Sequence, residues 1–204
     1  MMYPDPEALE ILVPEGKGEV EFTPALTLEN DSTRIVVEGE FGATDWYSIQ
    51  AAVPIYFSKP HLLNVSLENT FVLYFDDEKR LIINGMLDFA IPLRTGSPFE
   101  LEPSVTLTKG FNWLFLLGSA GTAIEISDGD LEAVIIFSGG PYAQTGRFTF
   151  GIPVSGEFES GNFDFTVALE SDIRIADFFS ILLLPSYAID KEKWLIYAGL
   201  KLES

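Results

Sequence analysis

The chain has no cysteine and a single histidine, His61. Without thiols it can form no disulfide, no thiolate metal site and no cysteine nucleophile. His61 follows Pro60 in a predicted turn, and no neighbour in sequence supplies the nucleophile and orienting carboxylate of a hydrolase site. We therefore expect neither enzymatic activity nor a bound cofactor.

Basic residues are also scarce. Lysine and arginine number 12 against 31 aspartates and glutamates, which gives a formal net charge of −19. Proteins that bind nucleic acid need a basic surface, so the composition argues against a nucleic-acid partner. The same charge disfavours attachment to an anionic membrane surface through a basic helix.

Long apolar runs are missing, although 47% of the residues are hydrophobic. The longest segment without a charge is 110–124, shorter than the roughly 20 residues of a transmembrane helix. The first residues are acidic, contain Pro4 and Pro6, and lack the basic and apolar regions of a signal peptide. We expect no spanning helix. The doubled Met1-Met2 favours a sequence that begins at a mature end.

Strict alternation of apolar and polar residues is what the chain does contain, most clearly over 148–169. Residues 159–162, E-S-G-N, separate two such stretches and have the composition of a tight turn. Period two on both sides of a short turn predicts a β-hairpin. The apolar parity consists of Phe148, Phe150, Ile152, Val154, Phe158, Phe163, Phe165, Val167 and Leu169.

The same unit recurs along the chain, with turns predicted at 30–33, 42–45, 58–61, 76–79, 94–97, 109–110, 127–130, 143–147, 159–162, 170–172 and 190–193. About twelve strands result, within a range of 10–14, and no βαβ spacing appears. The predicted fold is therefore an all-β antiparallel up-and-down meander. Closing this meander into a barrel would remove its exposed edges. Residues 1–16 form an N-terminal extension, and 17–204 form one barrel domain. The least regular segment is 173–189, where D-F-F-S-I-L-L-L is also compatible with a buried helix.

The function depends on which face of the barrel is wet. A soluble barrel points its apolar parity inward, whereas a membrane barrel points it at lipid. Twelve strands with apolar interiors would leave a large void. Aromatic residues crowd the predicted strand ends, as interfacial girdles do, and strand lengths match a tilted bilayer span. These observations favour a transmembrane barrel.

Two features favour the alternatives, a soluble barrel or β-sandwich around an apolar ligand, or a passive structural scaffold. Prolines interrupt many apolar segments, and proline donates no ladder hydrogen bond. Both sets of turns are short, which is typical of a minimal or designed barrel rather than one with long outer loops. The prolines concerned are Pro24, Pro54, Pro92, Pro103, Pro141, Pro153 and Pro185.

At the level of class, residues 17–203 resemble outer-membrane β-barrels in their period-two strands, aromatic strand ends, acidic charge and closing strand W-L-I-Y-A-G-L-K-L. The chain departs from that class at its end, because Leu202 stands where a terminal aromatic is usual. The resemblance implies an outer-membrane location, a lipid bilayer or detergent as partner, and a monomer. A soluble protein is the alternative.

Carboxylates on the polar parity are the candidate functional residues. A ring of them in a lumen would concentrate cations and exclude anions. The prediction is a water-filled, cation-preferring pore for ions or small solutes, and a solvated acidic rim is the alternative reading. The predicted pore-lining residues are Glu68, Asp88, Glu100, Glu102, Glu132, Glu157 and Asp164. Asp128-Gly-Asp130 could suit calcium, but such a sequence is more typical of a hairpin turn, so no metal site is predicted.

Overall fold

The computed structural model describes residues 17–30, 33–56, 64–93, 98–127, 130–159 and 161–204. The predicted extension 1–16, the turns at 58–61 and 94–97, His61 and Asp128 lie outside these residues. No helix in the described ranges is long and apolar enough to cross a membrane.

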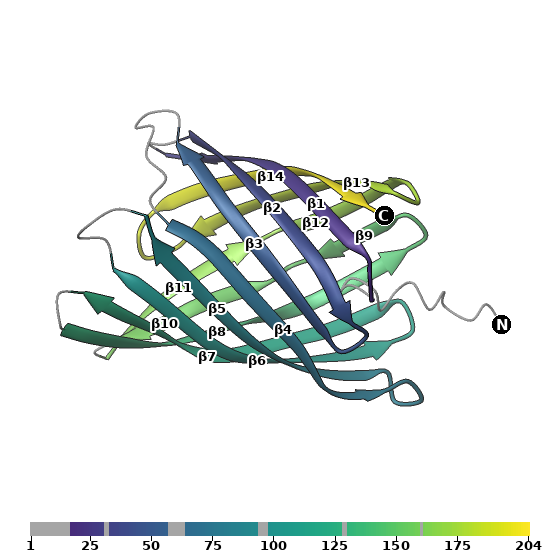
Figure 1. Cartoon of the computed structure of the whole chain (residues 1–204), viewed down its shortest axis with the longest axis horizontal. Coiled ribbons are helices and arrows are strands. Elements are labelled where there is room, and N and C mark those ends of the chain that lie inside the picture. Colours follow the sequence, from purple (N-terminus) through teal and green to yellow (C-terminus); the bar gives the residue numbers. More distant parts are fainter. Residues whose placement is uncertain (1–16, 31–32, 57–63, 94–97, 128–129, 160) are drawn as a thin grey trace.

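The described chain forms fourteen strand segments in one antiparallel sheet (Figure 1). They are β1 (Val20–Glu29), β2 (Thr33–Thr44), β3 (Tyr47–Tyr56), β4 (Asn64–Asp76), β5 (Leu81–Pro92), β6 (Phe99–Phe111), β7 (Leu114–Ser127), β8 (Asp130–Thr145), β9 (Phe148–Gly151), β10 (Val154–Glu159), β11 (Asn162–Ala168), β12 (Glu170–Ala176), β13 (Phe179–Ala188) and β14 (Lys193–Glu203).

Pairing of β1 with β14 closes the sheet into a barrel. Segments β9 and β10 both pair with β8, and β11 and β12 both pair with β13. Each of these two pairs is therefore one interrupted strand, and the barrel has twelve strands. The predicted twelve-stranded antiparallel barrel is confirmed.

The first interruption, between β9 and β10, falls at Ile152 and Pro153, one of the seven prolines that argued against a closed barrel, and the second, between β11 and β12, falls at Leu169. Ile152 N still donates to Pro141 O at 3.1 Å, and Ala168 N donates to Pro153 O at 2.9 Å. The strand therefore breaks locally while the barrel stays closed. The other six interrupting prolines lie within strand segments.

The helix alternative for 173–189 is wrong, because this segment lies in the hairpin β12–β13. The turns predicted at 170–172 and 109–110 are also wrong: these residues lie in β12 and β6, and the turns follow at 177–178 and 112–113. Strand β13 pairs with β14 from Phe179 to Ala188, so its backbone groups join the sheet ladder. Its outward Ile181 and Leu183 alternate with inward residues. The continuous apolar run in β13 arises because the inner face also carries apolar side chains in this strand, Leu182 and Leu184.

The two ends of the barrel differ in their connections. Turns 45–46, 112–113, 146–147 and 177–178 have just two residues, and with turn 77–80 they lie at the end where β14 finishes. We call this the terminal end. The loop end, opposite, carries the connections 30–32, 57–63, 93–98, 128–129, 160–161 and 189–192. Asn112 and Gly146 have positive φ, the conformation that two-residue hairpin turns demand.

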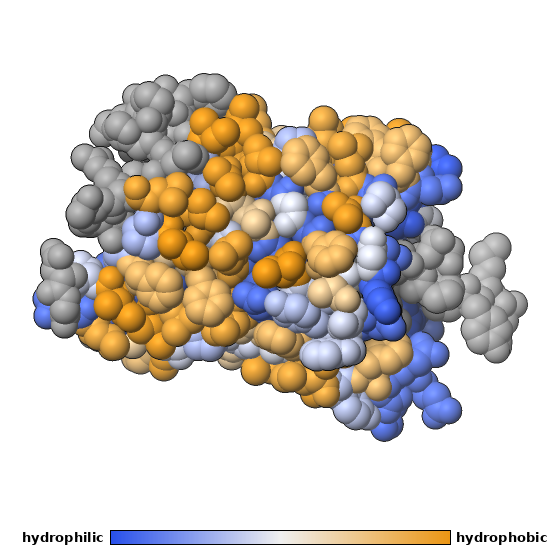
Figure 2. All heavy atoms as spheres, in the orientation of Figure 1, coloured by the Kyte–Doolittle hydropathy of each residue, from blue (hydrophilic) through white to orange (hydrophobic). Residues whose placement is uncertain are grey.

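The outside of the barrel is apolar. Large hydrophobic side chains such as Phe22, Val105, Phe150 and Leu183 are more than a third exposed. Hydrophobic residues cover much of the face in Figure 2, and hydrophilic residues gather at the terminal end on the right. Among the described residues, six polar ones are buried instead: Thr23, Thr27, Ser48, Asn84, Thr108 and Ser180. The apolar face thus meets lipid, and the soluble alternative with an apolar interior does not fit this arrangement.

Candidate functional site: the inner face

The inner face is the side of the sheet that carries the buried threonines and serines. Residues directly opposite one another in an antiparallel ladder share a face, with Cβ atoms about 4.5–5.5 Å apart. The cross-strand register therefore places every strand residue on one side or the other. All seven predicted lining residues, Glu68, Asp88, Glu100, Glu102, Glu132, Glu157 and Asp164, lie on the inner face. Their role in selectivity stays a prediction.

Three of the seven belong to a longer row that crosses seven strands. Successive direct partners, from β14 through β1 to β6, are Glu203, Glu21, Glu40, Gln50, Glu68, Asp88 and Glu102. We call this row the carboxylate track. It begins beside the terminal end and reaches β6 near the loop end, so it runs the length of the lumen. Sequence parity could assign Glu21 and Glu40 to the polar face, but only the register aligns them with Glu68.

Hydroxyl side chains support the middle of the track. Ser66 Oγ donates to Asp88 Oδ1 at 2.7 Å, and Thr70 Oγ1 donates to Glu68 Oε1 at 3.1 Å. These two hydrogen bonds fix the orientation of the carboxylate groups that accept them. The track is thus built to keep carboxylate oxygens facing the lumen.

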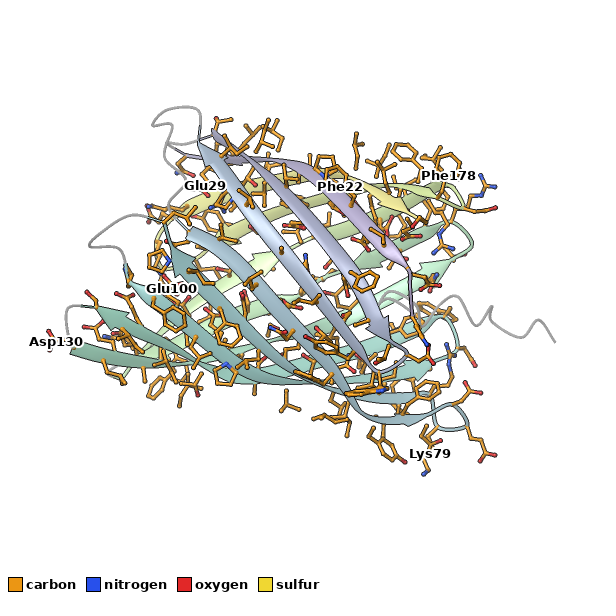
Figure 3. The ribbon with its side chains drawn as sticks, in the orientation of Figure 1. Phe22, Glu29, Lys79, Glu100, Asp130 and Phe178 are labelled. Atoms are coloured by element: carbon orange, nitrogen blue, oxygen red, sulfur yellow. The ribbon has the colours of Figure 1, made fainter. Side chains whose placement is uncertain are left out.

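The other predicted residues form two groups near the loop end. Glu100 lies opposite Glu125, which lies opposite Glu132, across β6, β7 and β8. Glu157 lies opposite Asp164 in the β10–β11 hairpin. The labelled Glu29, Glu100 and Asp130 mark this end in Figure 3, and Lys79 and Phe178 mark the terminal end.

The Glu157–Asp164 pair borders a cavity of about 210 Å³ whose lining also includes Ser138, Ser155 and Lys191. Lys191 Nζ lies 3.0 Å from Asp164 Oδ2. This hydrogen bond raises the pKa of Lys191, which lies in the turn beyond the strands. A second loop-end cavity, of about 200 Å³, is bordered by 29–30, Ser186 and 193–195. The loop-end part of the lumen is therefore hollow.

Two basic residues of the inner face form ion pairs with carboxylates, Lys201 and Arg34. Lys201 Nζ lies 2.6 Å from Glu21 Oε2 and 2.9 Å from Glu203 Oε1. Arg34 lies 3.3 Å from Glu29. No group of three or more potential metal-ligating side chains suited to a metal ion occurs among the residues that the structure describes.

Aromatic side chains ring the outer ends of the wall. Trp46, Trp113 and Phe178 lie in terminal-end turns, and Tyr187 and Trp194 lie at the loop end. Each of these is exposed. Rings of this kind sit at the two interfaces of a bilayer, so the predicted girdles agree with the structure.

Comparisons with known proteins agree with this architecture. No protein-family model and no curated protein matches the sequence. The fold is similar to the KdgM porin (TM-score 0.71, 8% identity, covering 89% of this chain and 98% of that one) and to the NanC porin (0.70, 10%, 90% and 98%). It is also similar to the translocator domain of the autotransporter NalP from Neisseria meningitidis (0.56, 9%, 96% and 91%). The chain therefore has the fold of a closed antiparallel β-barrel, similar to that of outer-membrane porins and of an autotransporter translocator domain.

Proposed function

We propose that the barrel is a water-filled pore of the outer membrane that passes small cations and small solutes and disfavours anions. The carboxylate track is the observation that carries this proposal. It would present a row of carboxylates, interrupted by the neutral Gln50, to a solute that moves from one end to the other. Carboxylates lining a narrow low-dielectric passage raise the local cation concentration.

The placement of these acids also speaks against a purely structural row. Like charges directly opposite in a β-ladder are destabilising, and Glu68, Asp88 and Glu102 are consecutive partners. Local rules of this kind are usually broken where function requires it. Mobile cations in the lumen would offset the repulsion among the three side chains.

The same charge bears on the class of solute. The KdgM porin has been solved in complex with disordered oligogalacturonate, which is a polyanion. The track of this chain would repel such a molecule. We therefore propose cationic or neutral small solutes. In membrane barrels the short turns face the periplasm, so the terminal end is proposed to face that side.

Single-channel recording in a planar bilayer under a KCl gradient tests the proposal. We expect stable conductance with a reversal potential of the cation-selective sign. The triple variant E68Q/D88N/E102Q should lower the cation-to-anion permeability ratio, because it removes three adjacent charges from the lumen. The matched control D77N/E78Q removes charges from an exposed turn and should leave the ratio close to that of the original chain. Anion preference, or no conductance, would refute the proposal.

A closed barrel that sits in the membrane without conducting is the second candidate. The tight burial of inner-face residues near the terminal end favours it, since side chains such as Ile82 and Phe115 fill that region. Absence of conductance from correctly folded protein would select this candidate. Heat-modifiable migration on a denaturing gel would establish that the recorded material is folded.

A further inference from the structure

The lumen is filled at one end and hollow at the other. Among the described residues, seven of the nine buried non-glycine residues lie toward the terminal-end turns: Thr23, Ser48, Ile82, Asn84, Thr108, Phe115 and Ser180. The other two, Ala25 and Thr27, lie further along β1 toward the loop end. The cavities of about 200 Å³ lie at the loop end, whereas a terminal-end cavity lined by 146–147, Thr149 and Asp172 measures only about 10 Å³. Inner-face side chains of the described residues are therefore packed more closely near the terminal end.

A cluster of three charged side chains lies in this closely packed part, at the pairing of β1 with β14 that closes the barrel. Lys201 of β14 contacts Glu21 of β1 and Glu203 of its own strand, at 2.6 and 2.9 Å. The Lys201 side chain is only 17% exposed. Thr23 Oγ1, itself buried, donates to the other oxygen of Glu21 at 3.0 Å. The three charged groups are held in place, and their charges sum to −1.

This cluster is also the terminal-end start of the carboxylate track, because Glu203, Glu21 and Glu40 are its first three members. Lys201 therefore neutralises one negative charge in the closely packed part of the lumen. Further along the described part of the track, Glu68 and Asp88 receive hydroxyl donors instead. The negative charge at the terminal-end start of the track is thus reduced by a tethered ammonium group.

We propose that Lys201 is a specificity-determining residue. Its ammonium group limits how strongly the terminal end of the lumen selects cations over anions. The inference rests on the proposed pore function. Coulomb energies grow as the surroundings lose water. One fixed charge therefore changes the energy of a passing ion more at the packed end than at the hollow end. The charge of the Lys201–Glu21–Glu203 cluster then controls the permeability ratio of the whole passage.

A charge series in the intact barrel tests this. The cluster carries −1 in the original chain, −2 in K201Q, 0 in E21Q and −1 again in the double variant K201Q/E21Q. We expect K201Q to raise the cation-to-anion permeability ratio by roughly two- to tenfold and E21Q to lower it by a similar factor. The double variant should return close to the original ratio, and K201R should preserve it.

Reversal potentials in a KCl gradient supply the ratio, and urea unfolding of the same proteins in lipid vesicles supplies stability. A purely structural role for Lys201 predicts lower stability in K201Q with no ordered change in the ratio, and that result would overturn the inference. If K201Q does not fold, E21Q and E203Q still move the cluster from −1 to 0, and an unchanged ratio in both would overturn it equally. K79Q removes a lysine from an exposed turn at the same end and serves as the control.

The failure of this inference can be told from failure of the pore proposal. If the chain conducts with cation preference but its permeability ratio does not change with the cluster charge, the proposed function stands and the role of Lys201 is refuted. A chain that conducts without cation preference, or does not conduct, loses both.

Discussion

Single residues inside the barrel are held by contacts that leave little spare room. Tyr142 on the inner face lies with its ring against Gly151 of the neighbouring strand, where a Cβ atom would overlap the ring. The Tyr142 hydroxyl donates to Glu170 Oε2 at 3.0 Å, which fixes the ring from its other end. Alternation places Gly151 on the inner face, but only the fold reveals that an aromatic ring occupies the space beside it.

The variant Gly151→Ala should therefore be destabilised. The new methyl group must displace the Tyr142 ring and weaken its hydrogen bond, and overpacking of this kind costs about 1–3 kcal/mol. Urea unfolding in lipid vesicles measures the loss. Gly118→Ala is the control, since nothing lies within 4 Å of its added Cβ atom. Equal unfolding free energies for the two variants would contradict the packing described for Tyr142.

At the scale of strands, alternation in the sequence was sufficient to predict the strand count, and the outward direction of the apolar face followed from the barrel size and the aromatic strand ends. The prediction succeeded because a strand fixes every second side chain on one side, whatever its neighbours are. It was least definite at 173–189, where the inner parity includes Leu182 and Leu184 and alternation fades. The break at Ile152 and Pro153 could be located from the proline, but whether the barrel would stay closed could not.

The loss of folding stability caused by a charged residue on the outer face should depend on the depth of that residue in the membrane. Leu183 lies near the middle of β13, and Phe178 lies in the terminal-end turn before it. Leu183→Arg is expected to destabilise the barrel by about 2–4 kcal/mol and Phe178→Arg by about 0–1 kcal/mol, as for arginine at the midplane and interface. Unfolding in vesicles provides the comparison. A larger loss for Phe178→Arg would show that the bilayer does not cover the wall as described.

At the scale of the whole molecule, the barrel combines a polar inner face with two unlike ends. The sequence identified the seven candidate carboxylates individually, from parity alone. It could not align Glu203, Glu21 and Glu40 with Glu68, because cross-strand register depends on the stagger of the closed sheet. Nor could it show that the terminal end is packed while the loop end is hollow, since that difference arises from side chains on many strands.

The central claim is that the inner face is a wet, negatively charged passage and the outer face meets lipid. Since the chain has no cysteine, single cysteines report on one position each. Ala90 lies on the inner face opposite Ser66 and Glu100, and its neighbour Phe89 lies opposite Leu67 on the outer face.

Charged, membrane-impermeant thiol reagents applied to the barrel in vesicles provide the most direct measurement. Ala90→Cys should be modified, and faster by a cationic than by an anionic reagent of similar size, while Phe89→Cys should stay unmodified. Modification of Phe89→Cys with protection of Ala90→Cys would contradict the orientation of the wall, and faster reaction of Ala90→Cys with the anionic reagent would contradict the acidic passage.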